Sequence, residues 1–452
     1  MKKNNCIPLV IILLFCLSIQ AQTKKWTLEE CVKYAIDNNI SIKQTELDTK
    51  TADIGKKDAI GNFIPSLNSN ASHSWNIGLN QDITTGLLRN QTSQFSSFGA
   101  GVGFDIYKGM QNQNTLRRAN LSIIAAKYQL TKMQEDVALN VANAFLQVLF
   151  NKENLKVQQE QKANNEKQLS RSEELVKAGS VPRGDLLDIK ATVASDAQKV
   201  VTAENTLLIS KLSLAQLLQL KEFYDFDITD DTSVKDENNI LAQTPIAVYD
   251  KAKEQRTELK IAKTNLDIAE KNVAIAKGAF QPTLQGFYNI NTRISYADTF
   301  DFQTGLSRPA ASFEQQFLDN KGQTFGAQIS IPVFNGWSVK NNVERSKVNL
   351  EKSKIAVEQE ELTLQRNVYT AFTDAKGGLN AYESAITALE ARQEAYNYAK
   401  ERYAVGIMNS FDFNQSQTLF TVAQSEVLRT KYDYIFKIKI LEFYFGIPII
   451  KN

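Results

Sequence analysis

The chain contains a long internal repeat, and this repeat limits what the sequence can fold into. A Phe-x-Pro-x-Leu segment at 63–67 recurs at 280–284, and the Phe-Gly-Ala segment at 98–100 recurs at 325–327. From the second match onward the two copies stay 227 residues apart (325 − 98). Two copies of this length are too few for a solenoid, so the sequence predicts one domain that is built twice.

Each copy shows the same order of expected elements: a helix, a strand, a loop, a second strand, a very long helix, a turn and a final helix. The first helix is expected from about Thr27 to Lys57, because Thr27 and Glu30 have the spacing of a capping box. The repeats are placed at 22–235 and 236–452, with strands near 66–77, 97–107, 283–296 and 324–334 and helical hairpins that turn at 179–184 and 406–411. The polar segments 78–95 and 297–323 are expected to be exposed loops, and the acidic segment 222–244 a surface belt or linker.

The expected strands alternate between apolar and polar residues with period two. In 97–107 every second residue from Phe98 to Ile106 is apolar, and the others are mainly serine and glycine. Strands of about ten residues suit a tilted crossing of a bilayer, and this alternation is typical of a water-filled barrel. A soluble sandwich with one wet face would alternate in the same way. Aromatic strand ends favour the membrane, and they are Trp75, Tyr107, Tyr296 and Phe334.

Four strands cannot close a barrel on their own, since even the smallest single-chain barrels use about eight. The unpaired edges of such a sheet must find partners. Three chains would supply twelve strands, so the strand count predicts an oligomer. The expected fold class is a membrane protein of mixed α and β structure. Each chain would contribute four transmembrane strands, and three chains would complete a twelve-stranded barrel.

Two long stretches have few helix breakers. Residues 111–178 contain neither proline nor glycine, nor do 340–376, and only a glycine pair at 377–378 interrupts before Gly406. An unbroken helix over 111–178 would be on the order of 100 Å long. Its narrow apolar stripe fits a coiled coil or a wall of helices with water on both sides. Gly179 and Gly406 suit the left-handed conformation at a helix end.

The first residues have the pattern of a secretory signal peptide. Two lysines precede an apolar stretch that is too short to span a bilayer, and Ala21 offers a small residue for cleavage. The signal peptide is therefore assigned to 1–21. Lipid attachment at Cys16 is not expected, because Phe15 stands where a lipoprotein signal would carry a small residue.

Composition excludes several classes of function. Removing residues 1–21 removes two lysines and no acidic residue, which leaves 50 basic and 50 acidic residues and no sign of a nucleic-acid partner. The single histidine, His73, lies in an expected strand with no metal-type cluster nearby. A Gly-x-Gly-x-Gly segment at 99–103 lies inside a strand rather than before a helix, so it is no phosphate loop. The sequence predicts neither an enzyme nor a cofactor or metal.

Several short segments together resemble a known family. They are Trp-Thr-Leu-Glu-Glu-Cys-Val at 26–32, the repeated Phe-x-Pro-x-Leu, and Arg-Tyr-Ala-Val-Gly at 402–406 followed by Ser-Phe-Asp-Phe at 410–413. Taken in order and in duplicate, they resemble the TolC-like outer-membrane factor family across nearly all of the mature chain. The resemblance implies a trimer with a twelve-stranded barrel in the bacterial outer membrane. It also implies a helical barrel in the periplasm that tapers to a closed entrance.

The resemblance implies an exit duct of a tripartite efflux pump or of a type I secretion system, which passively conducts small molecules, peptides or proteins. The implied partners are two further copies of the chain, outer-membrane lipid, a periplasmic adaptor protein and, through it, an inner-membrane pump. A coiled-coil tether or adhesin of the outer membrane is the alternative. It would share the long helices, but it would not need a polar barrel interior.

Carried over position by position, the resemblance also implies a gate. Tyr403 and Asp185 match a pair that latches neighbouring helices, and Asp412 matches an aspartate that lines the aperture. Gln415 stands where a second aspartate is expected and Met408 where a latching arginine often lies, so the ring is less acidic and the latch differs. Alternatively, Asp412 caps its helix and Asp185 simply suits a first helical turn. The adaptor is expected to contact Gly179, Ser180, Val181, Gly406, Ile407 and Met408.

Overall fold

The computed structural model describes residues 25–81, 86–221, 226–229, 240–301 and 303–449. The expected signal peptide and Cys16 lie outside the described residues. The chain divides into two compact units. The first draws on residues 1–47, 128–260 and 358–452, and the second on residues 48–127 and 261–357.

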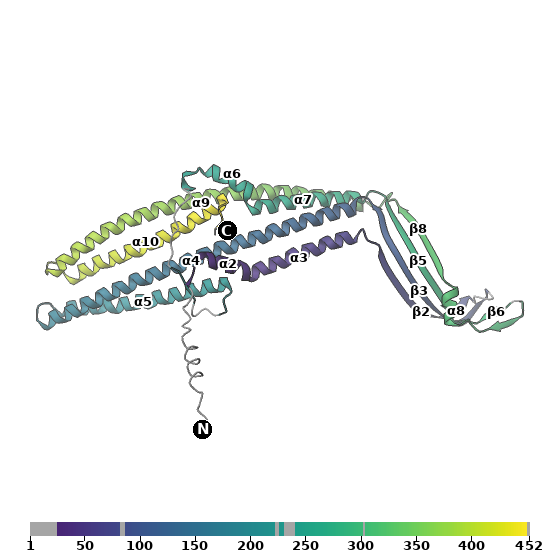
Figure 1. Cartoon of the computed structure of the whole chain (residues 1–452), viewed down its shortest axis with the longest axis horizontal. Coiled ribbons are helices and arrows are strands. Elements are labelled where there is room, and N and C mark those ends of the chain that lie inside the picture. The colour runs from purple at the N-terminus through teal and green to yellow at the C-terminus, as the bar shows by residue number, and fades with distance from the viewer. Residues whose placement is uncertain (1–24, 82–85, 222–225, 230–239, 302, 450–452) are drawn as a thin grey trace, which may run out of the picture. The chain divides into compact units, whose positions relative to one another are not determined.

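Most of the chain is helical (Figure 1). The eight longest helices among the described residues occur in pairs of equal length. No described helix combines the length and the apolar character needed to cross a membrane. The pairs are α2 (Leu28–Asn38) and α6 (Pro245–Gln255) with 11 residues each, α3 (Ile40–Gly61) and α7 (Thr257–Gly278) with 22, α4 (Gln111–Lys177) and α9 (Ser338–Ala404) with 67, and α5 (Arg183–Leu218) and α10 (Ser410–Phe445) with 36.

The first helix begins as expected but is interrupted. Thr27 caps α2, since its side chain accepts a hydrogen bond from the Glu30 N–H while the Glu30 carboxylate accepts one from the Thr27 N–H. The helix then stops at Asn39, whose backbone is extended and whose side-chain amide donates to the Leu217 carbonyl at 3.2 Å. The Asn39 side-chain oxygen also accepts a hydrogen bond from the Ser41 N–H at 2.9 Å, a local bond of the kind by which asparagine competes with helical hydrogen bonds. The single helix expected over 27–57 is therefore two helices, α2 and α3.

The glycine pair at 377–378 does not interrupt α9. Glycine costs only about 1 kcal/mol relative to alanine inside a helix, which is too little to break one of this length. A Cβ atom on Gly378 would lie 3.4 Å from Cα of Tyr434 and 3.2 Å from Cδ of Lys437. The missing side chain at Gly378 thus allows α10 to approach α9 closely.

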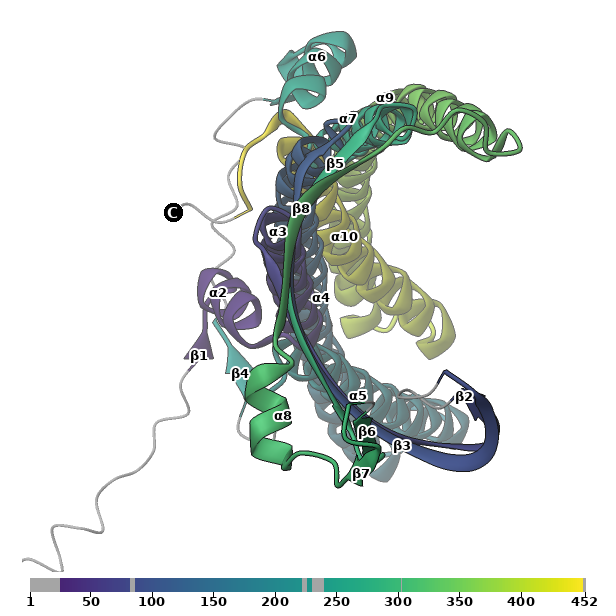
Figure 2. The same ribbon diagram turned by 90° about the vertical axis from the view of Figure 1, so that its right-hand side faces the viewer.

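Four antiparallel strands form a curved sheet in the second unit (Figure 2). Between Asp105 and Tyr107 a bulge leaves Ile106 without a partner on the neighbouring strand. The strands, in their order across the sheet, are β2 (Ser66–Gln81), β3 (Leu88–Lys108), β5 (Thr283–Ser295) and β8 (Gly322–Ser330).

The hairpin of β2 and β3 is longer than the sequence predicts. The two strands stay paired until Gln81 faces Leu88, within the segment 78–95 that its polar composition marks as a loop. Strands pair through their backbones, and an antiparallel hairpin can carry polar side chains where it is exposed. A polar sequence alone therefore does not show where a strand ends. Residues 82–85, at the tip, lie outside the described residues.

The strand β8 is shorter than expected, and the expected loop before it contains two short strands and a helix. β8 ends at Ser330 because Pro332, which follows closely, has no N–H to donate to a ladder. The expected loop at 297–323 contains β6 (Thr299–Asp301), β7 (Leu306–Arg308) and the short helix α8 (Phe313–Asp319).

The main apolar core lies in the first unit, where α2, α4, α5 and α10 meet a parallel pair of strands, β1 (Lys25–Trp26) and β4 (Asp227–Ile228). The sequence predicts a surface belt over 222–244, but Phe226 and Ile228 of this segment are buried. Residues 222–225 and 230–239 of the belt lie outside the described residues, and Ile240–Ala242 forms a short 3-10 helix. Fully buried side chains of this core include Val32, Ile42, Phe145, Leu149, Leu214 and Leu218.

Candidate functional site: the two faces of the sheet and the helical tips

One face of the sheet carries asparagine side chains that lie over glycines of the neighbouring strand. A Cβ atom on each of these glycines would overlap or crowd the facing amide oxygen, so the absence of a side chain makes room for the amide. Amides both donate and accept hydrogen bonds, and they carry no charge. The facing pairs are Gly99 with Asn70, Gly101 with Asn289, and Gly322 with Asn291.

The opposite face is apolar, and much of it is exposed in the single chain. Phe325 and Ile77 are each 82% exposed, and Leu67 is 73% exposed. An apolar face of this extent marks a surface for lipid or for another protein. His73 lies on this face with its Nδ1 2.8 Å from the Ser96 hydroxyl and its ring edge-on to Trp75, which gives it structural contacts.

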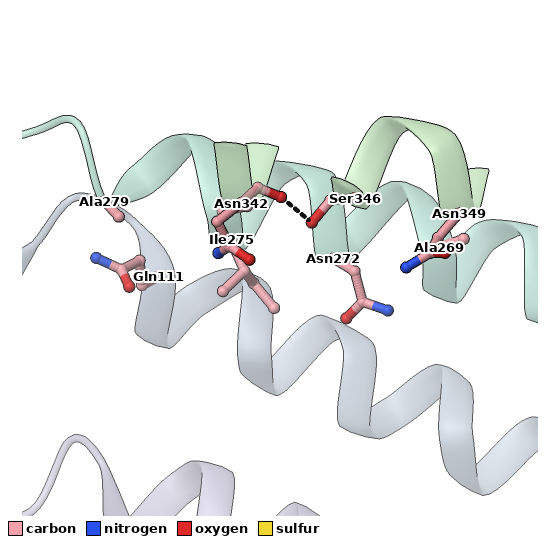
Figure 3. A pocket seen from close by; sticks show the side chains of 9 residues that line it. Gln111, Ala269, Asn272, Ile275, Ala279, Asn342, Ser346 and Asn349 are labelled. Atoms are coloured by element: carbon pink, nitrogen blue, oxygen red, sulfur yellow. Dashed lines mark hydrogen bonds between the residues drawn. The ribbon is translucent and has the colours of Figure 1, made fainter. Parts of the chain in front are cut away.

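A polar groove of about 300 Å³ lies in the second unit, lined by residues of α4, α7 and α9 (Figure 3). The Ser346 hydroxyl donates to the Asn342 carbonyl at 2.9 Å, and Arg118 donates to the Asn272 side chain at 3.3 Å. The lining side chains are uncharged, so the groove offers hydrogen bonds without an acid–base pair. The polar ones are Gln111, Asn272, Asn342, Ser346 and Asn349.

The turns between the paired long helices are built alike. Gly179 and Gly406 have φ values of +74° and +79°, the left-handed conformation that favours glycine. The Ser180 N–H reaches back to the Leu175 carbonyl at 2.9 Å, and the Ile407 N–H bonds the carbonyl five residues earlier, also at 2.9 Å. Both bonds close a Schellman turn, as the position of the glycines predicts.

The two turns differ in how much apolar surface they expose. In the second turn Val405 is 70% and Ile407 69% exposed, and Phe411 just beyond it is 70% exposed. In the first turn Val181 is half-buried. Contact of either turn with an adaptor stays a prediction, and the second offers more apolar area for it.

Asp412 lies in the first turn of α10 and is bonded to the residue that caps this helix. The cap of α10 is Asn409, whose side-chain oxygen accepts from the Asp412 N–H at 2.8 Å. The Asn409 amide in turn donates to the Asp412 carboxylate at 3.0 Å. Asp412 is exposed, so its second carboxylate oxygen remains available. The capping residue is thus Asn409 and not Asp412, and the role of Asp412 in an aperture stays a prediction. Gln415, also exposed, lies three residues further along α10.

Tyr403 stacks within its own hairpin. Its ring lies parallel to the buried Phe413 ring, with centroids 4.6 Å apart. Asp185 lies in the first turn of α5, and the structure of one chain contains no hydrogen bond between Asp185 and Tyr403, both of which it describes. A latch between the two thus stays a prediction that concerns neighbouring helices of an assembly. Met408, in the same turn as Gly406, is half-buried.

A buried charge cluster in the first unit is not apparent from the sequence. Arg256, between α6 and α7, is 4% exposed and binds Glu258 through two nitrogens at 3.0 and 3.2 Å and Glu135 at 3.0 Å. Its guanidinium carbon lies 3.8 Å above the centre of the Phe443 ring. Burial raises the pKa of the Glu135 carboxyl despite the nearby arginine. Burial opposes ionisation of Glu258 as well, but hydrogen bonds and charge from Arg256 hold its pKa below the usual value.

Comparison with known proteins decides the family. A sequence model described as outer membrane efflux protein matches residues 32–219 and 248–439, which is most of the chain. The chain belongs to the outer membrane efflux protein family. Its membership confirms the resemblance seen in the sequence, and it places this efflux protein in the bacterial outer membrane.

Relatives of this efflux protein are remote but match along most of their length. Outer membrane protein TolC of Escherichia coli (strain K12) is 22% identical over 402 residues, which cover 88% of the chain and 78% of the relative. Cation efflux system protein CusC of Escherichia coli O157:H7 is 22% identical over 326 residues, 70% of the chain and 63% of the relative. These names denote efflux and outer-membrane proteins, which fits the prediction of a non-enzyme.

Solved structures share the fold. A crystal structure of CusC superimposes with a TM-score of 0.77 at 17% identity, covering 92% of the chain and 91% of the other. A membrane protein from Pseudomonas aeruginosa gives 0.78 at 16% identity, covering 92% and 90%. The fold of this efflux protein is thus that of known outer-membrane channels.

Proposed function

We propose that three copies of the chain close their sheets into a twelve-stranded barrel across the outer membrane and form the exit duct of a tripartite efflux pump or a type I secretion system. The helical part would lie in the periplasm and receive substrates from an adaptor protein and an inner-membrane pump. The duct would conduct passively. The observation that carries this proposal is the open four-stranded sheet, with one apolar exposed face and one amide-lined face.

The edges of the sheet support closure by other copies. In the described part of the chain, β2 pairs only with β3 and β8 pairs only with β5, so one edge of each is free. Free edges are rarely left exposed in native proteins. A barrel removes both edges and would turn the apolar face towards lipid and the amide face towards water.

Exposed heptad stripes on two helices support the same assembly. On α3, Ile40, Leu47 and Ile54 are each more than half exposed and are spaced by seven residues. On α9 the same holds for Val348, Ile355 and Leu362. Apolar residues at a seven-residue spacing pack against a second helix in coiled coils. Helices of a neighbouring copy would cover these stripes.

We also propose that the two halves of the chain are copies of one ancestral unit. The four helix pairs of equal length support this, because each pair joins a helix of the first half to its sequence counterpart in the second. Gly109-Met110 and Gly336-Trp337, 227 residues apart, have positive φ at all four residues. A shared backbone conformation this unusual for Met110 and Trp337 is expected of duplicated segments.

The proposal predicts a conductance that depends on Asp412. In planar bilayers the purified protein should give small cation-selective steps that a trivalent cation such as hexaamminecobalt(III) blocks, because three carboxylates meet at a narrow pore. Asp412→Ala should weaken the block by at least about tenfold, or roughly 1.4 kcal/mol. Glu401→Ala is the matched control: it removes an exposed carboxylate near the same tip and should leave the block unchanged.

A variant with a weakened latch distinguishes the channel function from the alternative function as a tether. Tyr403→Phe removes only the hydroxyl and keeps the ring on Phe413, so it can be combined with Asp185→Ala without disturbing the hairpin core. This double variant should conduct more than the wild type. If neither protein conducts, the export duct is wrong and an outer-membrane tether becomes the better function.

A further inference from the structure

The short helix α8 lies on the apolar face of the sheet. The rings of Phe313 and Phe317 stack on each other, with centroids 6.0 Å apart, and both meet Phe98 of β3 edge-on at 5.9 and 5.6 Å. Phe98 belongs to the apolar face, as its place in the alternation of β3 predicts. Figure 2 shows α8 beside the sheet, at one side of the curved strands. The helix is therefore packed by aromatic contacts.

Hydrogen bonds attach α8 to the part of β5 that β8 does not reach. Pairing of β5 with β8 ends at Asn291 and Gly322. Beyond that point the Gln316 side chain accepts from the Ser295 N–H and donates to the Ser295 carbonyl, both at 2.9 Å. Asn320 donates to the Arg293 carbonyl at 2.7 Å. The helix thus satisfies a strand edge that would otherwise be open, one of the ways in which proteins protect edges.

The exposed surface of α8 mixes apolar and polar side chains. Phe313 is 49% exposed and Leu318 52% exposed. Glu314, Gln315 and Asp319 are exposed as well. A helix that exposes both kinds of side chain is suited to a membrane interface, where apolar side chains meet acyl chains and charged ones reach water.

The position of α8 along the strands agrees with an interface. Trp75 and Tyr296 both adjoin Gln94, and Tyr107 lies 13 residues further along β3 (107 − 94). At about 3.3 Å per residue and a tilt of about 45°, these aromatic levels are about 30 Å apart, the thickness of the hydrocarbon core. Phe98, which α8 contacts, lies four residues from Gln94 (98 − 94) and so about 9 Å below the Trp75 level by the same measure, within the depth to which an interfacial helix buries its apolar side.

We infer that α8 is an interfacial helix that rests in the outer boundary of the lipid bilayer, with Leu318 and Phe313 in contact with lipid. This inference rests on the proposed barrel. Lipid is favoured over a second copy of the chain because the rings of α8 contact Phe98 of β3, a strand paired on both sides, on the face that the proposed barrel turns towards lipid, whereas a neighbouring copy would join at β2 or β8. The aromatic side chains of α8 would lie near Trp75 at the same membrane interface and help to fix the depth of the barrel in the bilayer.

Site-directed spin labelling in proteoliposomes tests the inference. A nitroxide is attached at Leu318→Cys, and its collision rates with oxygen, which concentrates in lipid, and with a water-soluble nickel chelate are compared. Phe325→Cys on the apolar face and Asn76→Cys on the polar face are the lipid and water references. The oxygen-to-nickel ratio at Leu318→Cys should be several-fold higher than at Asn76→Cys. Cys31 is fully buried and should not react with the nitroxide reagent. Wild-type protein treated with the same reagent therefore measures the background of unspecific labelling.

The references separate failure of the inference from failure of the proposed function. If Phe325→Cys meets oxygen but Leu318→Cys meets nickel, α8 projects into water and the inference is overturned while the barrel stands. If Leu318→Cys meets neither reagent, protein covers α8, which also overturns the inference. If Phe325→Cys itself meets nickel rather than oxygen, the apolar face does not lie in lipid and the proposed barrel is wrong.

Discussion

Arg256→Ala is expected to lower the free energy of unfolding by about 3–5 kcal/mol, because it leaves two partly buried carboxylates without a counter-charge. Arg256 holds Glu135 and Glu258 together, and it also covers the Phe443 ring at the end of α10. Loss of this arginine therefore removes ion pairs and a cation–π contact at once. Guanidinium denaturation of the detergent-solubilised protein, followed by circular dichroism, measures the change.

Matched variants identify the cause of this loss. Adding Glu135→Gln and Glu258→Gln to Arg256→Ala removes the stranded charges, so the triple variant should be more stable than Arg256→Ala alone. Lys253→Ala removes a cation from an exposed ion pair with Glu361 at 2.9 Å and should have little effect. A triple variant no more stable than the single one would show that packing on Phe443, and not charge, explains the loss.

The loss should also depend on pH. In the wild type the lowered pKa of Glu258 adds stability that is present at neutral pH and lost as pH falls through that pKa, while the raised pKa of Glu135 acts in the opposite sense. Without Arg256, burial acts on both carboxyls unopposed and both pKa values should rise. Protonation then relieves the penalty, so the difference between wild type and Arg256→Ala should shrink as pH falls towards about 4. An equal difference at neutral and acidic pH would contradict this explanation.

Gly109→Ala is expected to be the second most damaging substitution. Gly109 joins β3 to α4 with φ +58°, and a Cβ atom on it would overlap the Gly278 carbonyl at the end of α7. The left-handed backbone costs alanine about 1–2 kcal/mol. The backbone overlap should add about 1–3 kcal/mol, because neither chain segment can rotate away as a side chain could. The expected readout is a lower denaturation midpoint and a smaller yield of assembled protein.

Gly336→Ala is the natural control for this prediction. Gly336 occupies the equivalent position in the second copy with φ +61°, but no atom lies within 4 Å of where its Cβ would be. Only the backbone cost of about 1–2 kcal/mol should therefore appear. Equal losses at the two glycines would mean that the close approach to Gly278 has no energetic weight.

Local sequence signals predict those elements that local physics controls. The absence of proline and glycine over 111–178 predicts α4 to within one residue of its end at Lys177, since backbone propensity acts residue by residue. The two faces of β3 follow from alternation alone, because side chains of a strand point to opposite sides. The capping pair Thr27 and Glu30 is local in the same sense and is present as predicted.

Features that depend on distant residues escape the sequence. Glu135 and Arg256 are 121 residues apart, so their pairing leaves no local pattern. The side-chain amide of Asn39, at the break between α2 and α3, donates to the Leu217 carbonyl, and no helix propensity reports that contact. The helix α8 did leave a weak signal in the Ser312 cap with Phe313 and Phe317 four residues apart, but a polar loop composition obscured it.

At the helical tips the sequence allowed two roles for Asp412, and geometry could test only one of them. Capping acts within a few residues, so a single chain displays the bonds between Asn409 and Asp412. An aperture forms only where several copies of the chain meet, and a latch joins neighbouring helices of that assembly, so both belong to the assembly and not to a single hairpin. The stack of Tyr403 on Phe413 shows what the aromatic ring does before any assembly forms.

The amides over glycines on the inner face have a consequence for traffic through the proposed barrel. Uncharged amides that donate and accept equally exchange hydrogen bonds with a passing solute much as water does. They hold no solute tightly, because each bond formed replaces an equivalent one that is broken. Where the amides line the barrel, they would therefore favour neither cations, anions nor neutral compounds. Selection by charge would fall to the proposed Asp412 ring, and selection by chemical identity to the machinery that loads the duct.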